Sequence, residues 1–316
     1  MTDRPEVAVP APGPHGGDAR ALARALRVPT SEILDLSATM NPVAPDVARL
    51  VRAAAEEVRV YPDAREATEA LAGEIGIEPE RVLLTNGGAE AIALVAQALA
   101  RAVVVEPEFS LWRRHLESVV AEPSEGTGRV RSNPNNPTGT LAGPDERAAA
   151  WDEAFYPLAT GRWTRGDASR GAIVVGSLTK LFSCPGLRIG YVLTPDADLA
   201  ERLSARQPNW SVNGLALAVL PELLERADLP SWSREVLALR SDLATVLGRW
   251  GFQVVASDAP WVLVPGAAWL RDPLARQGVL VRDCASFGLH DTVRIAVPRA
   301  AELVRLEAAL GRVRPA

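Results

Sequence analysis

The sequence predicts an α/β protein with about two domains, and three observations support that prediction. The chain has 316 residues, a length that is typical of two domains. In its first two thirds, short apolar runs typical of buried strands lead into turns rich in glycine or hydroxyl residues. In its last third, long helical patterns alternate with short apolar runs, an order that favours a small α+β domain.

The composition is that of a globular protein, with 47% hydrophobic and 23% charged residues. The net charge of −5 and the mixing of both signs leave no basic face for nucleic acid. No apolar run approaches the ~20 residues that span a bilayer, and the N-terminal segment lacks the features of a signal peptide. Cys184 and Cys284 are too far apart for a metal knuckle. We therefore expect a soluble cytoplasmic protein without a bound metal.

The N-terminal segment is expected to be a loose arm, because residues 1–14 are rich in proline and alanine. His15-Gly16-Gly17 forms a turn, and a second polar turn over 37–42 contains Asn41. An isolated histidine beside glycines is usually only a loop residue. The elements predicted here are a helix over 19–27 and a strand over 33–36.

A glycine-rich turn, Asn86-Gly87-Gly88-Ala89, separates a predicted strand from a predicted helix. This order aims free backbone N–H groups and a helix dipole at an anion, with Gly88 and Ala89 as the donors. Alone, such a turn is a weak signal. Upstream, Pro62 fixes the direction of Tyr61. The predicted elements are helices over 46–59 and 91–101 and strands over 82–85 and 102–106.

The middle of the chain contains two motifs: a rigid turn and a short segment with an aspartate. Two prolines and a glycine make Asn133–Gly139 a rigid turn that can aim one amide side chain. Asp152 lies in the segment Trp151-Asp152-Glu153-Ala154-Phe155-Tyr156. Phe109 follows the strand predicted over 102–106, where its ring could stack on a ligand or pack in the core.

The strongest signal is the stretch 176–191, which follows a strand predicted over 172–175. Lys180 can form a Schiff base with an aldehyde cofactor. Ser177, Thr179 and Arg188 can then hold the phosphate of that cofactor. The alternative is a surface lysine on a turn near an ion-pairing arginine.

The C-terminal part contains two arginines on predicted strands, Arg282 and Arg294. A guanidinium group binds carboxylate or phosphate through two parallel hydrogen bonds, although an arginine at a strand end is more often a surface ion pair. The predicted helices lie over 198–206, 212–226, 232–250 and 268–277 and from 299 on, and the predicted strands over 253–256, 261–264, 279–282 and 293–297.

Taken in order, these motifs resemble the class I/II aminotransferase superfamily, the fold-type I enzymes that use pyridoxal 5′-phosphate (PLP). The resemblance implies a large α/β domain with a mostly parallel sheet, a smaller α+β domain and a homodimer. We expect an N-terminal arm and small-domain contribution over 1–45, the large domain over 46–210 and the small domain over 211–316. Only 23 residues separate Phe109 from Asn133 and 12 separate Gly139 from Asp152, so the large domain is expected to be trimmed relative to the family.

The resemblance also implies a role for each motif residue. Lys180 would bind PLP covalently, Asp152 would face its pyridine nitrogen, and Asn136 would donate to its O3′. Phe155 replaces a tyrosine that is common in the family, so only Asn136 serves O3′ unless Tyr156 compensates. Phe109 would stack on the ring. The residues expected at the phosphate are Gly88, Ala89, Ser177, Thr179, Arg188 and, from the partner subunit, Tyr61. Those expected at the substrate are His15, Asn41, Arg282 and Arg294.

Within the superfamily, the opening His15-Gly16-Gly17, the turn ending in Asn41-Pro42, and Phe155 resemble the L-threonine-O-3-phosphate decarboxylases of cobalamin biosynthesis. Decarboxylation of a phosphorylated amino acid is therefore the first expectation. The alternatives are a histidinol-phosphate-type aminotransferase and a catalytically weak homologue that only binds PLP.

Overall fold

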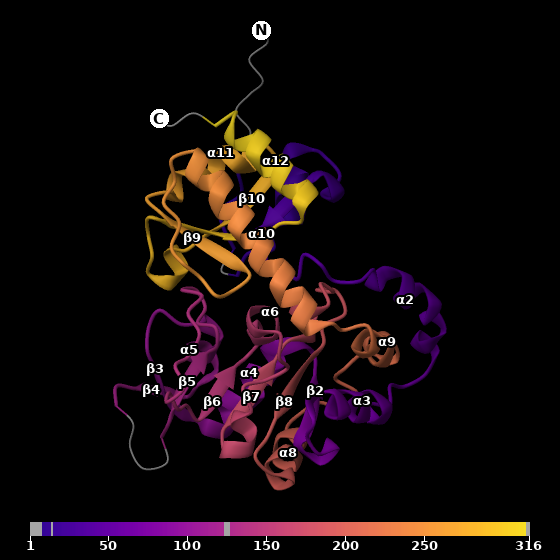
Figure 1. Ribbon diagram of the computed structural model, residues 1–316. Coiled ribbons are helices and arrows are strands. Elements are labelled where there is room, and N and C mark those ends of the chain that lie inside the picture. The colour runs from indigo at the N-terminus through magenta and orange to yellow at the C-terminus, as the bar shows by residue number, and fades with distance from the viewer. Residues whose placement is uncertain (1–7, 14, 123–126, 314–316) are drawn as a thin grey trace.

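The computed structural model describes residues 8–13, 15–122 and 127–313 and contains two β-sheets with helices around each (Figure 1). The strands are β1 (Leu34–Leu36), β2 (Val82–Thr85), β3 (Arg101–Val104), β4 (Ser118–Val120), β5 (Arg129–Ser132), β6 (Ala150–Asp152), β7 (Ile173–Gly176), β8 (Gly190–Leu193), β9 (Trp261–Pro265), β10 (Val279–Asp283) and β11 (Thr292–Ala296). The α-helices are α1 (Ala19–Leu26), α2 (Val47–Ala53), α3 (Arg65–Ile75), α4 (Gly87–Leu99), α5 (Ser110–His115), α6 (Tyr156–Thr160), α7 (Leu178–Leu181), α8 (Ala197–Ser204), α9 (Gly214–Glu225), α10 (Leu229–Arg249), α11 (Arg271–Arg276) and α12 (Ala300–Leu310). None of these helices is long and apolar enough to cross a membrane.

The larger sheet has seven strands in the order β2-β8-β7-β6-β5-β3-β4. Its strands pair in parallel except for β8, which is antiparallel to both of its neighbours. Successive residues of a strand face opposite sides, and β6 shows this clearly. Ala150 packs in a core cluster with α4 and α5, whereas Trp151 packs in another with α3 and α9. Helices thus bury both faces of this sheet.

The smaller sheet has the order β1-β10-β11-β9, in which β1 and β10 are parallel and the other pairs antiparallel. It therefore joins a strand from the N-terminal part of the chain to three from the C-terminal part. Helix α10 packs against α6 beside the large sheet and against β9 and α12 of the small one (Figure 1). Asp228 starts this helix by accepting a hydrogen bond from the Ser231 N–H at 2.9 Å, and Pro230 lies in its first turn.

The α/β fold with a mostly parallel sheet is confirmed, and most predicted elements lie within a few residues of their predicted bounds. The strand predicted over 253–256 is wrong, because only an isolated bridge between Val255 and Leu263 forms there. Strands β4, β5, β6 and β8 were not predicted as strands. The boundary expected at residue 210 stays a prediction, and α9, which follows it, packs in the same core cluster as Trp151.

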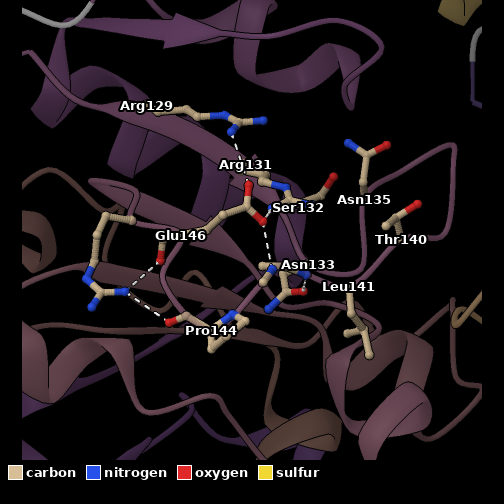
Figure 2. A network of polar contacts seen from close by, with 12 residues as sticks. Arg129, Arg131, Ser132, Asn133, Asn135, Thr140, Leu141, Pro144 and Glu146 are labelled. Carbon is tan, nitrogen blue, oxygen red and sulfur yellow. Dashed lines mark hydrogen bonds and ion pairs between the residues drawn. The ribbon is translucent and has the colours of Figure 1, made fainter.

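The large domain is shortened between β5 and β6. Parallel neighbours are usually joined by a crossover helix, but residues 133–149 contain neither helix nor strand. Arginines hold this connection instead, as Figure 2 shows around Glu146. Arg131 and Arg165 lie 5.9 and 4.9 Å from the centre of the Trp151 ring, and Arg165 donates to the Gly143 carbonyl at 2.8 Å. The two guanidinium groups thus pack over the ring of Trp151, which is fully buried, and tie the helix-free connection to β6.

Candidate active site

Lys180 lies at the C-terminal end of β7, in the short helix α7. Its side chain lines a pocket of about 540 Å³ to which both sheets contribute. It is the only lysine in the 316-residue sequence. Eleven of the fourteen predicted site residues line the pocket: His15, Gly88, Ala89, Phe109, Asn136, Asp152, Ser177, Thr179, Lys180, Arg188 and Arg294. Two of the four residues expected at the substrate, His15 and Arg294, are among them.

Glycines at one end of the pocket allow the Arg188 guanidinium and the backbone of β8 to lie very close to the start of α4. A Cβ at Gly87 would lie 2.5 Å from Nη2 of Arg188, and Gly87 has a positive φ of 78°. A Cβ at Gly190 would lie 2.7 Å from both Gly87 C and Gly88 N. These contacts pack the start of α4 against β8, with the Arg188 guanidinium beside the helix terminus. Free N–H groups, a helix dipole and a cation at one point suit a phosphate.

Thr179 fixes the Arg188 loop rather than offering a free hydroxyl. Its Oγ1 donates to the Ile189 carbonyl and accepts from the Ile189 N–H, both at 3.0 Å. The neighbouring Arg188 has a left-handed backbone with φ of 54°, which is uncommon for a residue with a side chain. The paired hydrogen bonds at Ile189 hold that conformation in place. Ser177 also lines the pocket and is largely buried.

The opposite end of the pocket presents an acid, an amide and an arginine. Asp152 is buried and accepts a hydrogen bond from the Ala154 N–H at 3.0 Å. Arg294 Nη1 donates to the Asn136 Oδ1 at 2.6 Å, which leaves the Asn136 amide N–H groups available for another acceptor. The Arg294 guanidinium also lies 4.9 Å from the centre of the Trp261 ring. The rigid turn therefore places Asn136 at the pocket wall, and its role as a donor to a cofactor stays a prediction.

Burial controls the charges of these groups. Desolvation, followed by Arg294 and Arg188, lowers the pKa of Lys180 to about 8, although Asp152 opposes the shift. Desolvation raises the pKa of Asp152 to about 6 against the Ala154 N–H and Lys180. A lysine with this pKa has a sizeable fraction of neutral amine near neutral pH, which is the form that attacks an aldehyde.

The N-terminal arm closes one side of the pocket. The His15 ring meets Phe109 edge-on, with centroids 5.9 Å apart and an interplanar angle of 62°. Burial, followed by Arg282, Arg114 and Lys180, holds the pKa of His15 below its ordinary value. Gly17 N–H donates to the Ser37 hydroxyl at 3.0 Å, which attaches the arm to the turn after β1. Pro14 lies outside the described residues.

Three predicted residues do not line this pocket. Arg282 donates to the Gly13 carbonyl at 2.6 Å and to the Ser286 hydroxyl at 2.8 Å, so it holds the arm. Asn41 donates to the Leu181 carbonyl at 2.9 Å and thereby braces α7. Substrate binding by either residue stays a prediction. Tyr61 is 77% exposed, stacks on Trp210 at 4.4 Å and stays a predicted contributor to a partner's site.

Several pocket residues were not predicted from the sequence. Arg20 and Met40 line the pocket, as does Thr39, whose buried hydroxyl has no hydrogen-bond partner among the described residues. Thr39 lies in the turn 37–42 that the sequence did single out, so its hydroxyl could have been a candidate. Phe155 also lines the pocket, with its ring edge-on to Trp261 at 4.9 Å, whereas Tyr156 does not line it.

The donor set fits PLP. Gly88, Ala89 and Arg188 would hold its phosphate, Asp152 would pair with its pyridine nitrogen, and the Lys180 amine would hold its aldehyde carbon. The support is steric as well as chemical, because a Cβ at Gly87 would displace the Arg188 guanidinium and a Cβ at Gly190 would push β8 away from the start of α4.

Comparison with known proteins gives a consistent result. The family model for aminotransferase class I and II matches residues 103–311. Histidinol-phosphate aminotransferase 2 of Methylococcus capsulatus is 31% identical over 89% of this chain and 90% of its own length. Threonine-phosphate decarboxylase of Salmonella typhimurium is 29% identical over 95% of this chain and 96% of its own. Histidinol-phosphate aminotransferase of Sinorhizobium meliloti, solved with pyridoxal-5′-phosphate, has the same fold, with a TM-score of 0.79, 20% identity and coverage of 96% of this chain and 94% of that one.

Proposed function

The chain belongs to the class I and II aminotransferases, which are PLP-dependent enzymes, and we propose that it transfers the amino group of a phosphorylated amine or amino acid. The observation that carries the proposal is the position of Lys180. Its amine is buried in one pocket with Asp152 and Arg294, and its pKa is lowered to about 8.

PLP bound in this pocket would supply an electron sink for bonds at the substrate Cα. Lys180 is placed to move a proton at that carbon, because an amine with a pKa near 8 can both accept and donate one near neutral pH. Asp152 would stay ionised when paired with a protonated pyridine nitrogen, although burial raises its pKa to about 6.

Arg294 supports an anionic substrate. Its guanidinium lines the pocket and is held by Asn136 and by the Trp261 ring. A guanidinium group binds carboxylate and phosphate equally well in a bidentate manner, so the same residue could serve an amino-acid donor and a phosphorylated amine. Arg20 on the arm side would extend this cationic lining toward a phosphate. His15, whose pKa is lowered by burial and by nearby cations, could offer a ring N–H to the same group.

Amino transfer is placed first because several relatives that match most of this chain are histidinol-phosphate aminotransferases, including those of Methylococcus capsulatus and Symbiobacterium thermophilum. This favours the reaction that the sequence alone placed second. The first expectation, decarboxylation of L-threonine O-3-phosphate, remains the second candidate. It is favoured by the position of His15 at the pocket and by the likeness to the Salmonella typhimurium decarboxylase over 95% of the chain.

Two incubations separate the candidates. The PLP-loaded protein with histidinol phosphate and 2-oxoglutarate should form glutamate, because the amino group must pass to a keto acid. Threonine phosphate alone should release no CO2. Release of CO2 without glutamate formation would instead support the decarboxylase, and neither product from a PLP-loaded protein would favour a homologue that only binds the cofactor.

A homodimer is part of the same proposal. Tyr61 and the neighbouring Val58 and Val60 are exposed by more than 60%, and Tyr61 stacks on Trp210, which is 58% exposed. An exposed aromatic and aliphatic surface of this kind suits an interface. Sedimentation of the PLP-loaded protein should give the mass of a dimer, and a fully active monomer would exclude this part.

A further inference from the structure

Glu108 is a buried acid just outside the pocket that no predicted role uses. Its side chain is 2% exposed and lies between the end of β3 and the rigid turn 133–139. Glu106, two residues earlier, is exposed and forms an ion pair with Arg113 at 2.9 Å. The two acids therefore differ in environment although they share one short segment.

Four donors converge on the Glu108 carboxylate. Oε1 accepts from the Phe109 N–H at 2.6 Å and from the Ser132 hydroxyl, and Oε2 accepts from the Ser132 N–H at 2.9 Å. The amide of Asn135 also donates to Oε2 at 3.4 Å. An ionised carboxylate only accepts hydrogen bonds, so this arrangement matches the charged form.

The contacts continue from Glu108 to the cofactor side of the turn. Because the Ser132 hydroxyl donates to Glu108, its lone pairs face the Asn136 N–H, which donates to it at 2.8 Å. Asn136 in turn lines the pocket and is held by Arg294. On the other side, Glu108 fixes the backbone N–H of Phe109, whose ring also lines the pocket.

We propose that Glu108 is a positioning residue that sets Asn136 and Phe109 against the ring of the bound cofactor. This inference rests on the proposed use of PLP but not on the substrate or the reaction. Its physical basis is the direction of the hydrogen bonds. The Ser132 hydroxyl accepts from the Asn136 N–H, so its own proton is directed to the Glu108 carboxylate, which can only accept.

The electrostatic surroundings explain why so many donors are present. Desolvation raises the pKa of Glu108 to about 7, the bonds from Ser132 and Phe109 lower it, and the charge of Asp152 raises it. When Asp152 pairs with a protonated pyridine nitrogen, its negative charge is compensated. Cofactor binding should therefore favour the ionised form of Glu108 and the bond pattern that holds Asn136.

The test uses the Glu108→Gln variant. Glutamine has nearly the same shape but turns one acceptor oxygen into a donor, which faces two other donors wherever it is placed. We expect the variant to bind PLP about ten-fold more weakly, as expected for a lost bond to a charged group, and to shift the absorption maximum of bound PLP. Glu117→Gln, an exposed acid shortly after α5, is the matched control and should leave both quantities unchanged.

A double-variant cycle with Asn136→Ala separates positioning from a general loss of stability. If Glu108 acts through Asn136, the changes in PLP affinity should not add, whereas independent effects would add within experimental error. Ser132→Ala breaks the same connection without touching the acid and should give the same spectral shift, so the test survives if Glu108→Gln does not fold.

The outcomes are distinct from those of the proposed function, because affinity and spectrum are read without substrate. A wild-type protein that fails to bind PLP would refute the proposed function. If the wild-type protein binds PLP and both Glu108→Gln and Ser132→Ala have the same PLP affinity and absorption spectrum as the wild type, the role of Glu108 is overturned. Fully additive effects with Asn136→Ala would overturn it as well.

Discussion

Replacing Gly190 by alanine should damage the phosphate end of the site while leaving its charges unchanged. The added Cβ would lie 2.7 Å from Gly87 C and Gly88 N and 2.8 Å from the Gly176 carbonyl oxygen. All three neighbours are backbone atoms, so no side chain can rotate away. An ordinary contact is about 3.4 Å or more, so β8 and the start of α4 must separate by several tenths of an ångström.

Two magnitudes follow from this geometry. Overpacking of a tight interior typically costs about 1–3 kcal/mol of the free energy of unfolding. Displacing the Gly88 N–H weakens a hydrogen bond to a charged phosphate, which is worth roughly 1.5–3 kcal/mol. The affinity for PLP should therefore fall about ten- to a hundred-fold.

The assay is a titration of the cofactor-free protein with PLP, together with a thermal melt of the cofactor-free form. Gly73→Ala is the control, because a Cβ there has nothing within 4 Å and lies in helix α3. That variant should keep its PLP affinity and gain about 0.5–1 kcal/mol from the helix preference of alanine. Wild-type affinity in Gly190→Ala would refute the close approach of β8 to the phosphate cradle.

Other predictions concern charge. For Asp152, burial raises the folded pKa to about 6, above the unfolded value. The cofactor-free protein should therefore lose roughly 2 kcal/mol of stability between pH 4 and 7 relative to Asp152→Asn; parallel melting curves would contradict this. That variant should also bind PLP more weakly. For Lys180, the folded pKa of about 8 lies below the unfolded value, so stability should rise between pH 8 and 10.5 in the wild type but not in Lys180→Met, as pH-dependent melts would show. Arg294→Lys should raise KM for a carboxylate substrate about ten-fold or more, because the bidentate geometry is lost; an unchanged KM would place the carboxylate elsewhere.

Motif residues near strand ends were predictable because their chemistry is local. Lys180 directly follows β7, Gly88 follows β2, and Asp152 ends β6. Parallel strands bring such positions to one edge of a sheet. The family resemblance implied that these residues share one site, and they line one pocket.

Residues whose role depends on pairing between distant segments could not be assigned in this way. Arg282 and Arg294 are direct cross-strand neighbours in β10 and β11, yet one holds the Gly13 carbonyl and the other contacts Asn136. Which of them meets the pocket depends on where the N-terminal arm lies. Glu108 was missed for a similar reason. Glu106 and Glu108 look alike in the sequence, and only the pairing of β3 with β5 makes Glu108 buried while Glu106 stays exposed.

The central claim is that Lys180 carries PLP, and the sequence makes this testable with one measurement. Because Lys180 is the only lysine, borohydride reduction of the PLP-loaded protein should add one cofactor per chain, and peptide mapping should place it on Lys180. A reduced cofactor on a peptide without Lys180, or a PLP-bound protein in which borohydride leaves Lys180 unmodified, would contradict the account.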